Sequence, residues 1–573
     1  MKLRHICVMF CLAALSLQVQ AQDLSRLRGT TPLQITGRIG TQNTFNLSST
    51  GYSYRSPWSN TLFANLNLNV YGFDIPLSFH LSNNNRAFSH PFAHFGMSPR
   101  YRNVRFHIGH RNMSFSPYTY SGLTFLGGGV EVDWKMLRLA FFSGNLNQAR
   151  AIESGSFSGN PYSYRRSALG VKLGVGNARN HVDLIIFNAR DDSTSIVLGA
   201  GQFLQPRENL VVGSTFRFNL GRHVVLTSNI AASAYNENMR SSSAGVKELQ
   251  GLDKFFTLRY GSVLRYAGDM NMHINIGRAR TSLQYRIIQP EFYSLGTTYM
   301  TNNVRRMGMN IYTPVLDNKV FVNLGLHHQT DNITNTQLYT SSGLVLSLNA
   351  TARLSEQLTI TGVYNGFNQQ QRDGTAQVME NLRINRVMHN FNLSPVYNFR
   401  TANKTHSVNG LFNGSISRNM NKQFEDPSNT TSLAVGAGYT LTLDESNTNI
   451  MVNFNHQNSS SSFYDFSSNN LGLGFGRRFL KEENLNMQVN TTLAYSQVNQ
   501  LTRNLSVMTG LNASYTYQKN HTANLRLGFN NIRNFHMEGL YSINGYHTSI
   551  SFGYSYRIPP VTPGKRGENA SMN

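Results

Sequence analysis

The most regular feature of the sequence is an alternation of apolar and polar residues at every second position, repeated along most of the chain. Comparable rows begin at Leu62 and at Leu433. The clearest row lies near the C-terminus and has serines between its larger members, which are Tyr546, Thr548, Ile550, Phe552, Tyr554, Tyr556 and Ile558. Because successive side chains of a β-strand point to opposite faces, these rows predict strands with one apolar and one polar face.

The rows come in pairs joined by short polar links, and the pairs are separated by longer Asn- and Ser-rich stretches. The links are Gly72 to Asp74, Lys135 to Met136, Gly176 to Asn180, Leu220 to Arg222, Gly277 to Arg278, Asp317 to Lys319, Ser355 to Gln357, Thr401 to Lys404, Asp444 to Asn447, Lys481 to Asn484 and Gln518 to Asn520. This arrangement is typical of a transmembrane antiparallel β-barrel, with short periplasmic turns and long extracellular loops. Counting the rows predicts an all-β barrel of about 24 strands, within a range of about 22 to 26.

Two stretches do not fit a simple up-and-down order. Rows Tyr101–His110 and Gly129–Trp134 would both have to run in the same direction if every link keeps its side. The chain between them, Asn112 to Gly128, must then cross back, either as a strand or as a segment inside the lumen. A second long interruption covers Asn238 to Asp269.

The ends of the chain differ from the rest. Residues 1–21 have the basic start, apolar stretch and small-residue cleavage site of a secretory signal peptide, and they contain both cysteines, Cys7 and Cys11. We expect residues 22–32 to form a short periplasmic segment, 33–558 the barrel and 559–573 a disordered periplasmic tail. Since alternation begins near Leu33, the segment before it is too short for the N-terminal plug domain of energised outer-membrane transporters.

Composition agrees with this interpretation. Hydrophobic residues make up 40%, aromatic residues 11% and charged residues only 14% of the chain. Past the signal peptide no apolar stretch is long enough for a membrane-spanning helix, which needs roughly 20 residues. A soluble periplasmic sandwich or propeller is the alternative, but its polar faces would be needlessly large.

The net charge is strongly positive. Its formal value of +23 falls by two, to +21, when Lys2 and Arg4 leave with the signal peptide. Basic residues are scattered along the chain, whereas nucleic-acid binders gather them on one face, so we expect no nucleic-acid partner. A basic barrel can instead face anionic lipid headgroups or line its lumen with arginine.

The whole predicted mature chain resembles bacterial outer-membrane barrels. Arg111–Val132 (RNMSFSPYTYSGLTFLGGGVEV) and Tyr162–Gly176 (YSYRRSALGVKLGVG) look similar to segments of large uncharacterised barrels of the Bacteroidota. The resemblance implies an outer-membrane location, with lipid, lipopolysaccharide and the barrel insertion machinery as partners, and it implies no activity. One departure is that the chain continues beyond Ile558 instead of ending on an aromatic residue of the last strand.

Candidate chemistry is sparse. His90 and His94 have the i, i+4 spacing of helical metal ligands, but no helix is predicted there, and a loop location explains them better. No Ser, His and acid spacing stands out as a catalytic triad, and the Gly127–Gly129 triplet lacks the Lys and Ser/Thr of a phosphate loop and suits a flexible start of a strand. We therefore predict no enzyme, cofactor or metal site.

Charged residues between apolar neighbours are more informative, because on a barrel they point into the lumen. They are Arg105, Glu131, Arg138, Lys172, Arg217, Arg286 and Arg526. A basic excess there favours anions, although Arg and Glu can also pair to stiffen the wall. The sequence thus predicts a porin-like channel for polar solutes, with anionic and glycan-derived solutes as candidates. The alternative is a non-conducting scaffold that docks with other envelope proteins in an assembly or secretion complex.

Overall fold

The computed structural model describes residues 33–49, 57–71, 73–83, 94–150, 162–199, 203–244, 256–377, 379, 383–421, 429–480, 482, 484–499, 502–535 and 544–561. The predicted signal peptide, the segment 22–32 and all but the first three residues of the predicted tail lie outside the described residues, so these assignments stay predictions.

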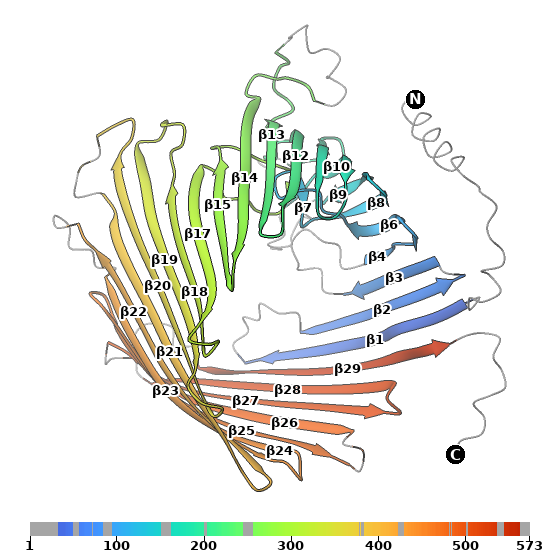
Figure 1. The fold of residues 1–573 in the computed structure, drawn as a ribbon. Helices are drawn as coiled ribbons and strands as arrows, with labels where there is room; N and C mark the ends of the chain where they lie inside the picture. The colour runs from blue at the N-terminus through green and yellow to red at the C-terminus, as the bar shows by residue number, and fades with distance from the viewer. Residues whose placement is uncertain are drawn as a thin grey trace.

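All but two of the described strands form one antiparallel sheet that closes on itself (Figure 1). Its first half consists of β1 (Leu33–Ser48), β2 (Trp58–Val70), β3 (Phe73–Ser82), β4 (His94–Met97), β5 (Arg100–Tyr101), β6 (Val104–Asn112), β8 (Thr124–Trp134), β9 (Leu137–Asn147), β10 (Arg165–Gly176), β11 (His181–Asp192), β12 (Glu208–Leu220), β13 (Val224–Asn236), β14 (Val263–Ile276) and β15 (Ala279–Ile288). The second half consists of β17 (Val304–Val315), β18 (Val320–Thr330), β19 (Tyr339–Arg353), β20 (Leu358–Asp373), β21 (Asn385–Thr401), β22 (Lys404–Asn419), β23 (Thr430–Leu443), β24 (Thr448–Ser461), β25 (Asp465–Phe479), β26 (Leu485–Val498), β27 (Thr502–Tyr517), β28 (His521–Phe535) and β29 (Gly545–Val561).

Pairing between the first and last strands makes this sheet a barrel. The β1 and β29 strands pair along most of their length, from Ile35 opposite Val561 to Ser48 opposite His547. Because β4 and β5 both pair with β3 and β6, they share one position, and the barrel has 26 strand positions. The all-β barrel class is therefore confirmed, and the observed number lies at the upper limit of the predicted range.

The last strand runs further than expected. It ends at Val561 instead of Ile558, so that Pro559 and Pro560 belong to β29. Proline has no N–H group to donate to a neighbouring strand and is found at strand ends and bulges. The pairing with β1 shifts register at this place, between Ile35 and Gly37, which accommodates the two prolines.

A tight turn missed in the sequence resolves the first irregularity. Arg102 and Asn103 join β5 to β6, and Arg102 has a φ of 51°. The predicted row Tyr101–His110 is therefore the end of one strand followed by a turn and the next strand. Residues 94–101 supply the strand that was not counted, and β6 runs opposite to β8. The second interruption, predicted from Asn238 to Asp269, is shorter than predicted, because residues 263–269 belong to β14.

All of the predicted short links join consecutive strands at one end of the barrel, which we call the turn side. The opposite end, the loop side, has connections of very different length. They range from residues 462–464 between β24 and β25 to residues 237–262 between β13 and β14. Among the described residues, no helix has the length and apolar composition needed to cross a membrane.

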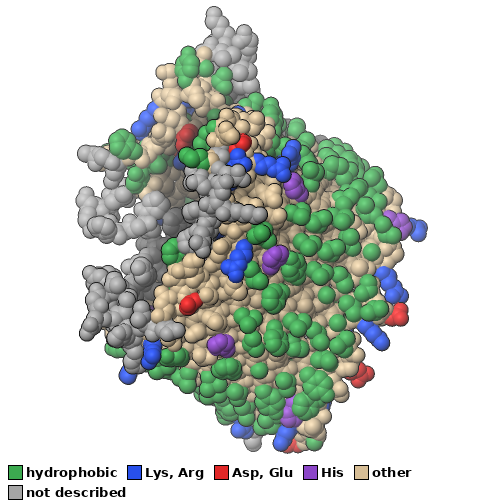
Figure 2. Space-filling view, turned by 90° about the vertical axis from the view of Figure 1, so that its left-hand side faces the viewer, with side chains coloured by type: hydrophobic (Ala, Val, Ile, Leu, Met, Phe, Trp, Pro, Cys, Tyr) green, Lys and Arg blue, Asp and Glu red, His purple; other side chains and the backbone are tan. Residues whose placement is uncertain are grey.

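The barrel has an apolar outer face. Paired residues share a face, so the register places Ile450, Val452 and Phe454 of β24 outside together with Leu471 and Leu473 of β25. All of these are exposed. Hydrophobic side chains cover the middle of the outer surface in Figure 2, and charged side chains gather along the right-hand edge of that view.

Candidate functional site: the lumen

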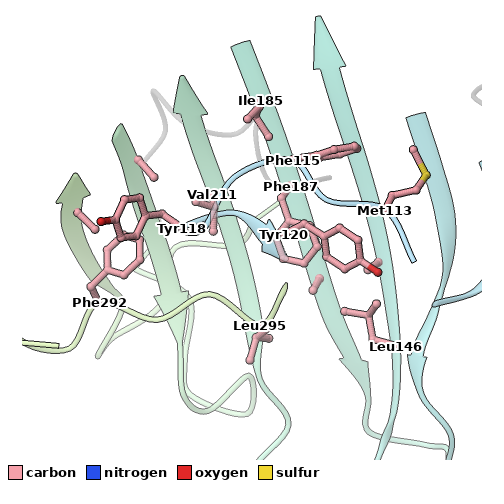
Figure 3. Close-up of a cluster of buried hydrophobic side chains, with 14 of the residues drawn as sticks. Met113, Phe115, Tyr118, Tyr120, Leu146, Ile185, Phe187, Val211, Phe292 and Leu295 are labelled. Carbon is pink, nitrogen blue, oxygen red and sulfur yellow. The ribbon is translucent and has the colours of Figure 1, made fainter. Parts of the chain in front are cut away.

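Two loop-side segments fold back against the inner wall. Residues 113–123 connect β6 to β8, and residues 289–303 connect β15 to β17. They pair in parallel through β7 (Tyr120–Ser121) and β16 (Gly296–Thr297). We call these two segments the lumenal buttress (Figure 3). The stretch predicted to cross back as a strand or a lumenal segment is thus lumenal over 113–123, whereas 124–128 begin β8.

Aromatic side chains join the buttress to the wall. The Tyr120 ring lies 4.4 Å from that of Phe142 on β9 and 5.7 Å from that of Phe187 on β11, centroid to centroid. Phe125 on β8 stacks on Phe142 at 4.7 Å. All four side chains are fully buried. Among the described residues, the hydrophobic core lies on one side of the lumen, where the buttress covers strands from β8 to β17.

A small number of buried polar contacts fix the second segment. The Asn209 side chain on β12 donates to Ser233 Oγ at 2.8 Å and to the Ala234 carbonyl at 3.0 Å, and it accepts from the Leu295 amide at 3.0 Å. Gly296 comes so close to the first segment that an added Cβ would lie 2.4 Å from the Thr119 carbonyl oxygen. A glycine is thus required where the two segments meet.

Burial also affects the Tyr118 side chain of the buttress. Loss of hydration raises the pKa of its hydroxyl well above the usual range, and the Asp269 carboxylate raises it further. The Arg286 guanidinium opposes this effect. Since Asp269 and Arg286 are directly opposite each other on β14 and β15, the wall presents both charges to the buttress.

Three of the predicted lumenal charges are ion-paired. Arg138 contacts the buried Asp183 carboxylate through two nitrogens, at 2.8 and 3.0 Å. Arg105 lies 3.5 Å from Glu131, and the His107 imidazole lies 3.3 Å from the same carboxylate. The Arg105–Glu131 contact joins the neighbouring strands β6 and β8, whereas the Arg138–Asp183 contact reaches from β9 across β10 to β11.

The other four predicted charges face the lumen in different surroundings. Lys172 places its ammonium 5.6 Å above the Phe115 ring of the buttress. Arg286 is exposed and faces Arg306 across the strand pair. Arg217 lies near the turn-side end of β12 and is half-buried, and Arg526 is exposed on β28 opposite Ser551. Six of the seven residues lie on strands between β6 and β15, and Arg526 lies on β28, so they do not form one site.

The wall from β18 to β29 is mostly neutral on its inner face. Asparagine recurs there, for example at Asn413, Asn453 and Asn512. On β24 the outward Val452 and the inward Asn453 are both exposed. This differs from β11, where outward Leu184 is exposed and inward Ile185 is fully buried. At β24, side chains on both faces of the wall are thus exposed, with apolar groups on the outer face and amides on the inner face.

Arginines form a series near the turn side of the lumen, each within a few residues of its strand's turn-side end. The register places these arginines on the inner face: Arg38, Arg105, Arg138, Arg217, Arg280, Arg353, Arg400, Arg478 and Arg557. Arg400 pairs with Asp444 at 2.7 Å. The series extends around the barrel and makes the turn-side opening basic.

One part of this opening is hollowed. A groove of about 950 Å³ lies between the turn-side ends of β14, β15, β17 and β18. We call it the basic groove, and its lining includes His273, Arg278, Arg280, Asn310, Tyr312 and Asn323. No Asp or Glu lines it.

The described residues show no group of metal ligands, but they include one chain of Ser, His and acid side chains. In it, Ser98 Oγ lies 3.0 Å from His107 Nδ1, and His107 Nε2 lies 3.3 Å from the Glu131 carboxylate. Among the described residues, no three His, Asp or Glu side chains come close enough to hold a metal ion together. His90 and the side chain of His94 lie outside the described part of the chain. Gly127 to Gly129 lie within β8 instead of at its start, and an added Cβ at Gly127 would lie 2.1 Å from the Ser143 carbonyl oxygen. These glycines allow close packing in the wall.

Sequence reasoning missed the buttress core and the basic groove. The run Leu184 to Phe187 on β11 is apolar on both faces, and such a run signals a strand covered on both sides. No comparable signal marks the groove, since its lining comes from four strands and two turns.

No protein-family model and no curated protein matches the sequence. Solved structures give weak likenesses at 10 to 11% identity. OccK5 (OpdH) of Pseudomonas aeruginosa has a TM-score of 0.30, with 62% of this chain and 94% of that chain covered. The translocation pore of the P pilus usher PapC has 0.36, with 92% and 100% covered, and the siderophore receptor PirA of P. aeruginosa has 0.36, with 92% and 80% covered. Likenesses at these scores carry no argument, and the barrel fold follows from the strand pairing itself.

Proposed function

We propose that the protein is an outer-membrane barrel. Support comes from the outer face, where every strand from β17 to β29 except β20 has exposed apolar side chains. Residues 546 to 558 of β29 span about 40 Å at roughly 3.3 Å per residue, and a tilt of about 40° reduces this to about 30 Å, the thickness of a bilayer core. Exposing such an apolar surface to water costs free energy, whereas exposing it to lipid does not.

Aromatic residues at the turn side support this location. On the outer face, His406 Nδ1 lies 2.7 Å from the Tyr439 hydroxyl, and His521 Nδ1 lies 2.7 Å from the Tyr554 hydroxyl. The Phe399 ring stacks on His406 at 4.5 Å. Rings with one polar end are favoured at the boundary between lipid tails and water. Because its connections are short, we assign the turn side to the periplasmic boundary.

Within this barrel we propose a channel for polar solutes. The observation that carries the proposal is the two-sided exposure of β24, because a wall with amides on its open inner face borders water. A circular ring of 26 strands spaced about 4.8 Å apart and tilted by about 40° is roughly 50 Å across. A layer packed on a sheet occupies only about 10 Å, so among the described residues the buttress fills only the part of the cross-section next to one wall.

The charge of the turn-side opening favours anions among these solutes. Arginines follow one another around it, and three of them, Arg105, Arg138 and Arg400, have carboxylate partners. A ring of fixed positive charge raises the local concentration of anions and lowers that of cations. Anionic or glycan-derived solutes are therefore the proposed cargo.

The proposal includes no enzymatic activity. It includes export by the signal peptide, insertion by the barrel insertion machinery, contact with lipid and lipopolysaccharide, and an origin in the Bacteroidota. The non-conducting scaffold is the competing function, in which the opening would dock with envelope proteins instead of admitting solutes.

Conductance in planar lipid bilayers tests the channel. Purified mature protein is expected to give large, stable steps with weak anion selectivity, measured as the reversal potential in a KCl gradient. The Arg526→Gln and Arg217→Gln variants should each shift that potential toward cations. Absence of steps, together with envelope proteins retained during purification in mild detergent, would favour the scaffold.

A further inference from the structure

The lining of the basic groove has an excess of positive charge. Arg280 and Arg278 contribute guanidinium groups from β15 and the preceding turn, and His273 adds an imidazole from β14. Arg138 and Arg400 elsewhere in the series each have a carboxylate partner. Among the described residues, no carboxylate lies in ion-pair distance of Arg280, so its charge does not serve to hold strands together.

Polar groups at the back of the groove are fixed in orientation. The Asn310 amide donates to Ser282 Oγ at 3.4 Å, and its oxygen lies 3.0 Å from Nε2 of the buried His327. These contacts hold Asn310 between β15 and β18. Asn323 and Asn275 add exposed amides to the same lining. The groove thus offers several neutral donors and acceptors beside its two guanidinium groups.

A flat apolar surface completes the lining. The Tyr312 ring is 41% exposed and stacks against Phe321, with 6.5 Å between centroids and 21° between planes. The stacking keeps the ring face in one place. Ring C–H groups of a sugar can pack on such a face while its hydroxyl groups bond to amides.

We propose that the basic groove binds hydroxylated organic anions of the uronic-acid type. The carboxylate would pair with Arg278 and Arg280, the hydroxyl groups would bond to Asn310 and its neighbouring amides, and the sugar ring would pack on Tyr312. A simple anion would use only the first contact, and a neutral sugar only the others. The inference rests on the proposed channel, for which it names the solute class and the place of selection.

Calorimetric titration of the purified protein in detergent tests the proposal, with glucuronate, glucose and acetate as probes. Glucuronate is expected to bind at least about tenfold more tightly than glucose or acetate, because it engages both sets of contacts. The double variant Arg278→Gln/Arg280→Gln should weaken glucuronate by at least about tenfold. The control is Arg526→Gln, which removes one positive charge from β28 across the lumen and should leave binding unchanged.

A second variant tests the sugar contact. Tyr312→Ala should weaken glucuronate and leave acetate unchanged, and circular dichroism should show that each variant retains its strand content. Equal affinities for acetate and glucuronate would overturn the proposal. So would a loss of glucuronate affinity in Arg526→Gln that equals the loss in the double variant. Because titration needs no current, the two hypotheses fail separately. Conductance without glucuronate binding would overturn only the proposed binding site in the groove. Glucuronate binding without conductance would overturn only the proposed channel function.

Discussion

Replacement of Phe142 by alanine tests whether the buttress is held by its aromatic contacts. The Phe142 ring is fully buried and lies 4.4 Å from Tyr120, 4.7 Å from Phe125 and 5.7 Å from Phe115, centroid to centroid. Loss of a buried phenylalanine costs about 3 to 5 kcal/mol through lost transfer energy and the remaining cavity. Because the barrel wall is closed by backbone pairing elsewhere, we expect this cost to fall mainly on docking of residues 113–123.

Hydrogen exchange read by mass spectrometry measures this directly. The Phe115 amide donates to the Tyr120 carbonyl at 2.9 Å, and the Leu295 amide to the Asn209 side chain at 3.0 Å. A loss of about 3 kcal/mol corresponds to roughly a hundredfold faster opening. Peptides covering 113–123 and 290–297 should therefore exchange at least about a hundredfold faster in Phe142→Ala, while peptides of β21 to β24 should not change.

The neighbouring Phe141 provides a matched control. It is the preceding residue of β9, and its side chain points out of the barrel. The variant Phe141→Ala removes the same ring from the same strand without touching the buttress. Equal acceleration of exchange in the two variants, or none in Phe142→Ala, would refute the assignment of the buttress to aromatic packing.

Three further predictions concern the wall. Arg138→Gln leaves the buried Asp183 carboxylate without its cation and should destabilise the barrel by about 3 to 5 kcal/mol, measured as the urea midpoint of folding into vesicles. Leu511→Arg on the outer face should cost about 2 to 4 kcal/mol in the same assay, whereas Asn512→Arg on the inner face, which borders water in the proposed channel, should cost much less. Asn209→Ala should lower stability by about 1 to 3 kcal/mol and deprotect the Leu295 amide in hydrogen exchange.

The barrel class could be predicted because most strands, such as β24, have two different environments and therefore alternate at every second residue. The turns could be predicted because short polar links, such as Gly277 to Arg278, interrupt two apolar rows. The Arg102–Asn103 turn could not, since Tyr101 and Val104 are apolar and the row looks continuous. One missed turn removed one strand and produced a false conflict of direction.

The lumen was less predictable than the wall. The inward direction of Arg138 follows from its place between Leu137 and Leu139, but its partner Asp183 lies two strands away and depends on register. The buttress is formed by contacts between residues such as Tyr120 and Phe187, which are far apart in sequence. Local periodicity contains no information about such contacts, so a single sequence shows only that β11 is apolar on both faces.

The most direct test of the central claim is a cysteine scan along β24. Both cysteines of the chain lie in the predicted signal peptide, so single cysteines at Val452, Asn453, Phe454 and Gln457 would each be the only thiol of the mature protein. In lipid vesicles, a charged, membrane-impermeant thiol reagent should modify the variants at Asn453 and Gln457, whose side chains face the lumen, and should leave those at Val452 and Phe454 unmodified. Equal modification at all four positions, or modification only at Val452 and Phe454, would contradict a wall with lipid outside and water inside.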